Sequence, residues 1–191
     1  MRTIILTILV TTSLFASASD RPDYKLIKSY EIYDIYGSTP EELEESFVKQ
    51  KPRALVETGF DATTDWDYDM SYDTNTCRAT DLTLYVDFTL PIIHTSKLTD
   101  EVKKNVTEYT NAIYAHEQVH CSLIIEKINS MYDKVRKGEK GDCDEYYKKV
   151  SDEITNSINK VNKEFDRSTD HGRKPTDFSK YKYMNLCKFP F

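Results

Sequence analysis

Several features that would place the chain in a common class of protein are missing from its sequence. After the first 18 residues no stretch is apolar enough to form a membrane segment, so we expect no stable membrane insertion of the remaining chain. There are no internal repeats, which excludes a repeat architecture. Positive charge is not in excess: the formal net charge is -6, which argues against nucleic acid or an anionic membrane as the main partner.

The only long apolar stretch stands at the very start of the chain. It follows a basic residue, Arg2, and gives way to small residues at Ala16 and Ala18. This pattern is typical of a secretory signal, and the apolar core is too short for a retained anchor. We predict a signal peptide at residues 1–18 and a single domain at residues 19–191, located outside the cell or in the periplasm.

Cysteine is scarce, and no pair has the Cys-x-x-Cys spacing of a thiolate zinc site. In an exported chain the four cysteines are expected to form two disulfides. The helix that we expect around Cys121 runs to about Arg136, which carries the chain roughly 22 Å and disfavours a bridge from Cys121 to Cys143. Two pairings stay open: Cys77 joins either Cys121 or Cys143, and Cys187 takes the cysteine that is left.

The chain after the signal begins with a strand signal and a helix signal. Residues 30–36 (YEIYDIY) are rich in aromatic and β-branched side chains and predict a strand. A short helix should follow, with Thr39 as its N-cap, Pro40 at its first position and Pro52 at its end.

The middle of the chain changes from a period of two to a helical period. Residues 66–72 and 82–90 alternate apolar and polar side chains on either side of a polar turn, which predicts an antiparallel hairpin. From Thr99 to just before Gly138 apolar residues recur every three or four positions, which predicts one long helix. A second such stripe, residues 147–165, should fold back on it. We predict an α+β fold, with a small antiparallel sheet packed on the long helix and an antiparallel C-terminal helix.

The long helix carries two of the four histidines one turn apart, in the segment AHEQVHC. His116 and His120 lie on the inward-facing stripe and present their imidazoles to one point. Two imidazoles at this spacing supply half of a tetrahedral zinc site. Glu117 points about 100° round the helix, where its carboxylate can take a proton from an attacking water. The segment therefore predicts a zinc site with Glu117 as general base.

A catalytic zinc ion needs a third protein ligand. The metzincin continuation is absent, because residues 121–126 contain neither its glycine nor its third histidine. If the helical hairpin turns near Gly141, the two histidines lie opposite about residues 162–166. The acidic and histidine candidates there or just beyond are Glu164, Asp166 and His171. We favour His171, because imidazole is the preferred neutral ligand of zinc, with Asp166 as the alternative.

Three further side chains are weaker candidates for a functional role. His94 follows a strand end and is expected to be a surface histidine. Tyr109, on the same helix face two turns before His116, and Tyr114 are candidate donors to a developing oxyanion.

Five segments of the chain resemble a family of bacterial secreted proteins that are regarded as zinc-dependent proteases and catalogued as a domain of unknown function. They are YEIYDIYGSTPEEL, ATTDWDYDMSY, CRATDLTLYVDFTLP, AHEQVHC and FDRSTDHG. The resemblance extends from about Tyr30 to Gly172. It implies a zincin-like fold and proteolytic role, with His116 and His120 as zinc ligands, Glu117 as base and the Asp166–Gly172 segment as a further contributor. In one position the chain departs from the pattern, because Phe165 stands where a tyrosine often precedes the aspartate.

We therefore predict a secreted or periplasmic zinc metallopeptidase that acts on a peptide or protein substrate. The alternative is a non-catalytic envelope or extracellular binding module, in which a structural zinc ion joins two helices and has four protein ligands in place of three. A metal-free domain held together by its disulfides is the third hypothesis.

Overall fold

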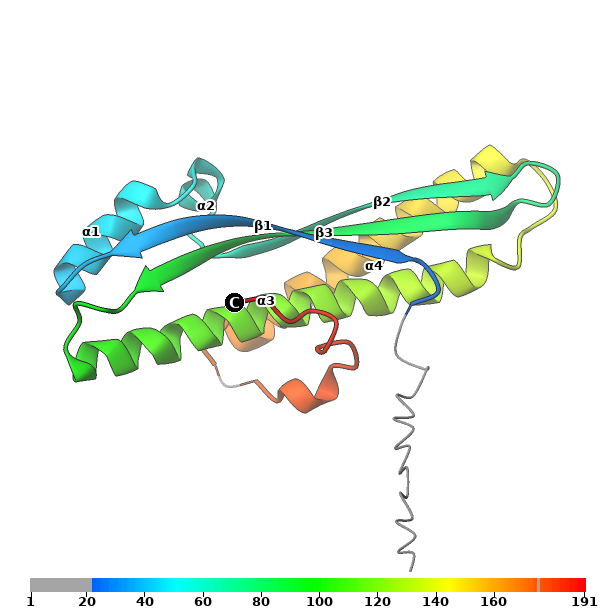
Figure 1. The fold of residues 1–191 in the computed structure, drawn as a ribbon. Coiled ribbons are helices and arrows are strands. Elements are labelled where there is room, and N and C mark those ends of the chain that lie inside the picture. The colour runs from blue at the N-terminus through cyan, green and yellow to red at the C-terminus, as the bar shows by residue number, and fades with distance from the viewer. Residues whose placement is uncertain (1–21, 175) are drawn as a thin grey trace, which may run out of the picture.

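The computed structural model describes residues 22–174 and 176–191, so the predicted signal peptide lies outside the described residues (Figure 1). Strands and helices are segregated in the way expected of an α+β protein, which confirms that class. In chain order the elements are β1 (Lys25–Tyr36), α1 (Pro40–Gln50), α2 (Arg53–Thr58), β2 (Thr63–Asp73), β3 (Arg78–His94), α3 (Asp100–Val135), α4 (Cys143–Thr169) and a 3-10 turn, η1 (Phe178–Lys180).

The three strands form one sheet in the order β1-β3-β2, with β3 in the centre. β2 and β3 are the predicted antiparallel hairpin, but β1 runs parallel to β3, so the prediction of a purely antiparallel sheet is wrong. Only neighbours joined by a tight turn are forced to be antiparallel. β1 is separated from β3 by α1, α2 and β2, and a connection of that length allows a parallel pair.

The central strand β3 carries the apolar face of the sheet. Its side chains alternate, and those on one face are almost fully buried against the helices: Leu82, Leu84, Val86, Phe88 and Leu90. The strand continues through Pro91, where the sequence predicted its end. β2 pairs with β3 only as far as Thr89, so at Pro91 the strand has a neighbour on one side only, where a residue without an N–H is tolerated.

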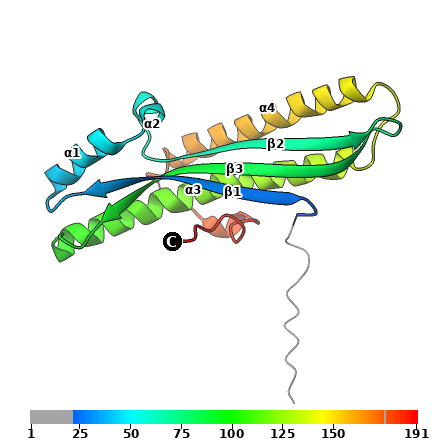
Figure 2. The ribbon, with the colours of Figure 1, turned by 45° about the horizontal axis from the view of Figure 1, so that its top comes forward.

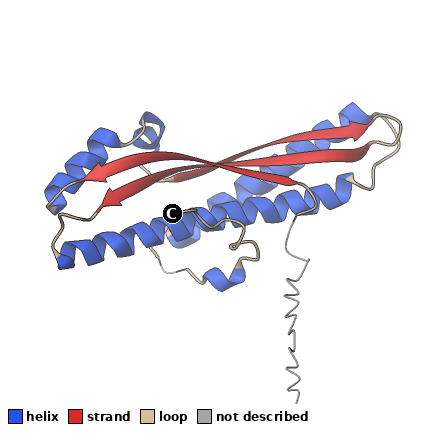
Figure 3. Ribbon diagram, in the orientation of Figure 1, coloured by secondary structure: helices blue, strands red, loops and turns tan. Residues whose placement is uncertain are grey.

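α3 and α4 form an antiparallel hairpin that covers this apolar face (Figures 1 and 3). The chain turns between them at residues 136–142, and Asp142 caps α4 by accepting hydrogen bonds from the backbone N–H groups of Asp144 and Glu145. The predicted long helix and its fold-back are therefore confirmed. The short helix after β1 is also present, and the hydroxyl of Thr39 caps it as expected, whereas α2 was not predicted.

A second, smaller core lies at the end of the sheet where β1 finishes. It contains Tyr33 and Ile35 of β1 and Leu43 of α1, with the first turns of α3 packed against it. Figure 2 shows α1 and α2 gathered at this end, away from the turn between α3 and α4. Two separate cores thus fix the two ends of α3.

Two disulfides are formed, Cys77 with Cys143 and Cys121 with Cys187, which is one of the two pairings that the sequence left open. The first ties the β2–β3 turn to the start of α4. The second holds the C-terminal segment against α3, where Phe189 packs edge-on against Phe88 and Tyr114. Both are compatible with an oxidising, extracellular or periplasmic location. Within the described ranges, no helix is long and apolar enough to cross a membrane.

Replacement of Cys77 and Cys143 by alanine should lower the free energy of unfolding by about 2–4 kcal/mol, because the bridge closes a long loop in the unfolded chain. The bridge lies at the far end of the helical hairpin from His116, so we expect the surroundings of His116 to stay unchanged. Urea unfolding and the proton magnetic resonance signals of the His116 and His120 imidazoles in the double variant check both statements. A change of the imidazole signals together with the loss of stability would contradict this separation.

Candidate metal centre

The core of the site is a pair of histidines on α3. His116 and His120 are one turn apart and are 6% and 8% exposed. Their Nε2 atoms lie 3.0 Å from each other, with the two rings nearly perpendicular. Both rings point inward, as the apolar stripe of the sequence predicted, because the helix packs with this face toward α4.

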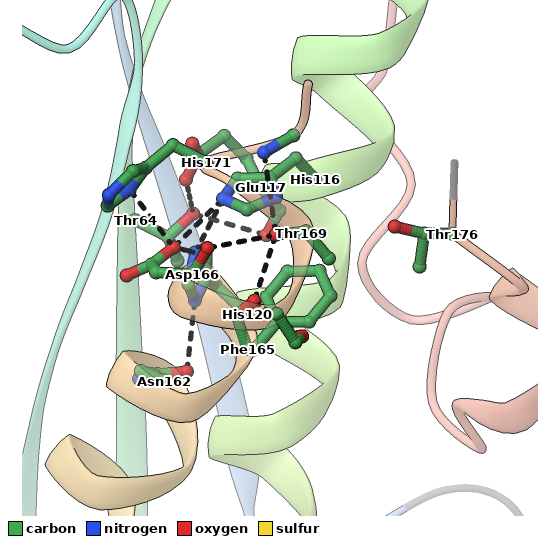
Figure 4. Close-up of polar contacts among 12 residues, drawn as sticks. Thr64, His116, Glu117, His120, Asn162, Phe165, Asp166, Thr169, His171 and Thr176 are labelled. Carbon is green, nitrogen blue, oxygen red and sulfur yellow. Dashed lines mark hydrogen bonds and ion pairs between the residues drawn. The ribbon is translucent and has the colours of Figure 1, made fainter. Parts of the chain in front are cut away.

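α4 brings a carboxylate to the same point. Oδ1 of Asp166 lies 3.0 Å from Nε2 of His116 and 2.9 Å from Nε2 of His120 (Figure 4). We call these three residues the His–His–Asp cluster; it is the one group of three potential metal ligands found in the described part of the chain. The predicted register, which placed residues 162–166 opposite the histidines, is confirmed. Of the acidic and histidine candidates from the sequence, the structure brings Asp166 into the cluster.

A second layer of side chains orients the two imidazoles. The amide oxygen of Asn162, one turn before Asp166 on α4, lies 3.0 Å from Nδ1 of His120 and accepts its hydrogen bond. The ring of Phe165 stacks on the ring of His116 at 4.7 Å. Such contacts fix the orientation of histidine ligands in metal sites. Phe165, the departure from the family pattern, thus supplies a packing surface for His116.

Glu117 lies beside the cluster without belonging to it. Its side chain is buried, and Oε2 accepts a hydrogen bond of 2.7 Å from the hydroxyl of Thr64, the second residue of β2. Burial raises the pKa of the Glu117 carboxyl, and the charges of the two histidines with the Thr64 hydroxyl offset that rise only in part. A carboxylate with a raised pKa is suited to accept a proton near neutral pH.

The titration of the cluster members is coupled. Burial alone would raise the pKa of Asp166, but its hydrogen bonds with His116 and His120 hold that pKa well below its usual range. Burial alone would lower the pKa of His120, yet the hydrogen bond to Asp166 and the charge of Glu117 outweigh it and raise the pKa. The cluster therefore favours a positive charge between the Nε2 atoms of the two histidines and Oδ1 of Asp166.

Acceptor atoms face one another in the cluster, and a cation or a proton between them would stabilise this arrangement. Because Asn162 accepts from Nδ1 of His120, the Nε2 atom of a neutral His120 carries a lone pair. That lone pair faces Oδ1 of Asp166, which is also an acceptor. Nδ1 of His116 is buried and has no hydrogen-bond partner in residues 22–174 or 176–191. The polar contacts of both rings with the cluster are therefore made through Nε2.

The spacing of the three atoms fits a zinc ion. Ligand atoms at about 2.1 Å from a tetrahedral ion lie about 3.4 Å apart. The observed distances in the cluster are 2.9 to 3.0 Å, so small side-chain shifts would complete the geometry. Two imidazole nitrogens and one carboxylate oxygen are also a donor set that zinc uses in catalytic sites.

The chain after α4 turns back toward the cluster through three residues with positive φ. Asp170, His171 and Gly172 have φ values of 51°, 52° and 83°. A side chain at Gly172 would place a Cβ 3.3 Å from the ring of His116 in a left-handed backbone, so this position favours glycine. His171, our first choice for the third ligand, borders the cluster: its Nδ1 is 3.7 Å from Oδ1 of Asp166, and its side chain is 45% exposed.

The other candidates from the sequence lie apart from the cluster. Glu164 is exposed on the outer side of α4. His94 is a surface residue that pairs with Asp34 at 2.7 Å. Tyr114 donates to the carbonyl oxygen of Pro91 and packs between α3 and the C-terminal segment, so it does not face the cluster.

The cluster opens into a pocket of about 460 Å³ between α3, the end of α4 and the segment before β2. Tyr109 lines this pocket together with His116, Glu117 and His171. Its hydroxyl donates to a carboxylate oxygen of Asp61, so the phenol is held at the pocket wall. A small molecule or an extended peptide could therefore reach both the cluster and Glu117.

The contributions of Thr64, Asn162 and Phe165 were not predicted from the sequence. Asn162 could have been found, because it stands four residues before Asp166 and so lies on the same face of α4. Thr64 had no such signal, since its contact with Glu117 joins two elements 53 residues apart.

Fold and site together define an α+β protein with a His–His–Asp cluster held between two antiparallel helices, beside a buried glutamate. The chain belongs to the family described as bacterial protein of unknown function (DUF922), whose model matches residues 30–172. The match ends at the glycine that packs on His116, so it includes the whole cluster. A comparison with curated proteins gives no match, and a comparison with solved structures gives none either.

The coupled titration predicts that the cluster stabilises the metal-free protein only within a window of pH. Asp166 has a lowered pKa, so its contribution is present above the unfolded value of about 3.9 and is lost as the pH falls through the folded value. His120 has a raised pKa, so its contribution is complete below about 6.5 and is lost as the pH rises through the folded value. The full effect is expected between about pH 4 and about pH 6.5.

Urea unfolding of the metal-free protein and of Asp166→Asn from about pH 3 to about pH 9 measures this window. The difference in stability should be largest inside the window and shrink on both sides of it. Proton magnetic resonance of the imidazoles should also show a lower pKa for His120 in the variant, with the distant His94 as reference. A stability difference that does not change with pH would contradict the coupling.

Proposed function

We propose that this protein is an exported zinc-dependent metallopeptidase, with His116, His120 and Asp166 as zinc ligands and Glu117 as general base. The observation that carries the proposal is that three potential ligand atoms lie close enough together for one ion to contact all of them. The buried carboxylate of Glu117 lies beside them and is not one of the three. The family assignment is consistent with the proposal but supplies no activity of its own.

The donor set favours a catalytic ion over a structural one. Catalytic zinc has three protein ligands and leaves one coordination position for water or substrate, whereas structural zinc has four protein ligands. The cluster supplies three, and the pocket lies on the side of Glu117. When bound, zinc would polarise the carbonyl of the substrate and make a water molecule more acidic.

The protein groups divide the remaining work. The Glu117 carboxylate takes the proton of the attacking water and passes it to the leaving amine, a role for which its buried position beside the cluster suits it. The hydroxyl of Thr64 holds that carboxylate in position. Asn162 keeps Nε2 of His120 free to act as a ligand, because it occupies Nδ1.

The arrangement also supports the zincin-like class as part of this proposal. β2 is an edge strand of the sheet and begins next to Glu117, so its free side is available to an extended peptide. A substrate segment that pairs with the start of this edge would lie close to Glu117. A secreted or periplasmic location agrees with the two disulfides.

One observation favours a second candidate function, a binding module with a structural zinc ion. Nδ1 of His171 lies 3.7 Å from Oδ1 of Asp166, and a modest rotation of this exposed ring would bring a fourth ligand to the ion. The number of protein ligands separates the two functions. The metal-free domain is the third hypothesis, and protein that holds no zinc after dialysis would support it.

The first test compares Asp166→Ala with His171→Ala. We expect Asp166→Ala to lower zinc affinity more than about 100-fold, since it removes a ligand, and His171→Ala to lower it less than about 10-fold. Competition with a fluorescent chelator measures both affinities. An equal loss in the two variants would indicate four ligands and favour the structural zinc.

The second test separates metal binding from hydrolysis. Glu117→Gln keeps an acceptor for the Thr64 hydroxyl but no longer takes a proton, so we expect one bound zinc per chain and a fall in peptidase activity of about 10² to 10⁴-fold. Glu126→Gln, an exposed change on the same helix, is the matched control and should keep full activity. Undiminished hydrolysis by Glu117→Gln would exclude the proposed mechanism.

A further inference from the structure

The pocket beside the cluster contains one permanently positive side chain among its described lining residues, Arg173. The three acidic lining residues are already engaged. Asp61 pairs with Lys51 and accepts from Tyr109, Glu117 accepts from Thr64, and Asp166 belongs to the cluster. Arg173 is therefore the charged lining side chain that is still available to a ligand.

The backbone that carries Arg173 is held in place on both sides. The N–H of Arg173 donates to the carbonyl oxygen of Asp170 at 3.2 Å, and the N–H of Lys174 donates to that of Thr169 at 2.8 Å. Gly172, directly before Arg173, packs against the ring of His116. Three consecutive residues with positive φ precede Arg173, the first of them the left-handed C-cap of α4, so the end of the helix sets the course of the chain at Arg173.

Arg173 is exposed and lines the pocket, and its guanidinium has no hydrogen bond or ion pair within residues 22–174 and 176–191. The charge of Arg173 acts on Tyr109. Burial and the contact with Asp61 raise the pKa of that phenol, and the positive charge of Arg173 opposes the rise. The charge thus acts inside the pocket, on the wall formed by Tyr109. An unpaired guanidinium in a pocket matches the planar, two-oxygen geometry of a carboxylate.

We propose that Arg173 binds a carboxylate of the substrate, so that the preferred substrates are peptides with an acidic side chain or a free C-terminal carboxylate near the bond that is cut. The proposal rests on the proposed function, because it assigns a substrate class to the same site. Both sources present the same chemical group, and the experiment below distinguishes them.

Binding is measured first, with the full zinc-loaded protein carrying Glu117→Gln so that no substrate is consumed. Three fluorescent peptides are compared. The reference peptide is neutral, contains glutamine and has an amidated C-terminus. The second differs from it only by glutamate in place of glutamine, and the third only by a free C-terminus. Several positions of the glutamate are tested. We expect at least one acidic peptide to bind about tenfold or more tightly than the neutral one.

Substitution at Arg173 identifies the group responsible. Arg173→Gln should bring the affinities of acidic and neutral peptides to within about twofold, and Arg173→Lys should restore part of the preference, because the charge returns without the two-pronged geometry. Lys174→Gln is the matched control: it removes the neighbouring exposed positive charge, which does not line the pocket, and should keep the full preference.

The outcomes separate this proposal from the proposed function. Equal binding of all three peptides, or a preference that survives Arg173→Gln, overturns the role of Arg173, whatever the activity of the protein. A preference that depends on Arg173, in a protein that hydrolyses none of these peptides when Glu117 is present, supports the carboxylate site and contradicts the peptidase. The glutamate and free C-terminus peptides show which source of the carboxylate is bound.

Discussion

The antiparallel packing of α4 on α3 is the contact on which the rest of the site depends. Two histidines on one helix supply only two of the three atoms, and the third comes from a residue 46 positions later in the chain. The turn at residues 136–142 sets the register of the two helices, and that register places Asp166 opposite both imidazoles. A shift of one turn, about 5.4 Å along the helix, would remove the carboxylate from the cluster.

The remainder of the molecule supports this contact from three directions. The sheet covers the apolar sides of both helices, and its central strand supplies the most deeply buried side chains. One disulfide anchors the start of α4, and the other holds the C-terminal segment on α3 beside the histidines. The start of β2 contacts Glu117 through the hydroxyl of Thr64. The sheet, the helical hairpin and the Cys121–Cys187 disulfide thus restrict the same few side chains.

The sequence predicted the parts of this structure that depend on local periodicity. The helical stripe around His116 and His120 and the second helical stripe can each be read within one segment, and the short connection between them predicts the fold-back. These predictions are confirmed. The parallel orientation of β1 was missed, because strand direction across a long connection is decided by how the intervening helices pack. α2 was missed because six residues have no clear period.

The choice of third ligand also depended partly on local sequence pattern and partly on tertiary packing. The fold-back narrowed the candidates to a few residues, but the preference for His171 was based on the chemistry of imidazole and on the frequent functional role of loop ends. The structure places Asp166 inside α4, facing the histidines, and His171 beyond the helix end with its ring at the surface. The contact between Thr64 and Glu117 has no local signature, because it depends on how the sheet meets α3.

A crystal structure of the zinc-loaded protein, with anomalous scattering at the zinc edge, tests the central claim most directly. The account predicts one zinc ion bound by Nε2 of His116, Nε2 of His120 and a carboxylate oxygen of Asp166, with a fourth position filled from the pocket by solvent. An ion held by four protein groups, or one bound away from these three residues, would contradict it.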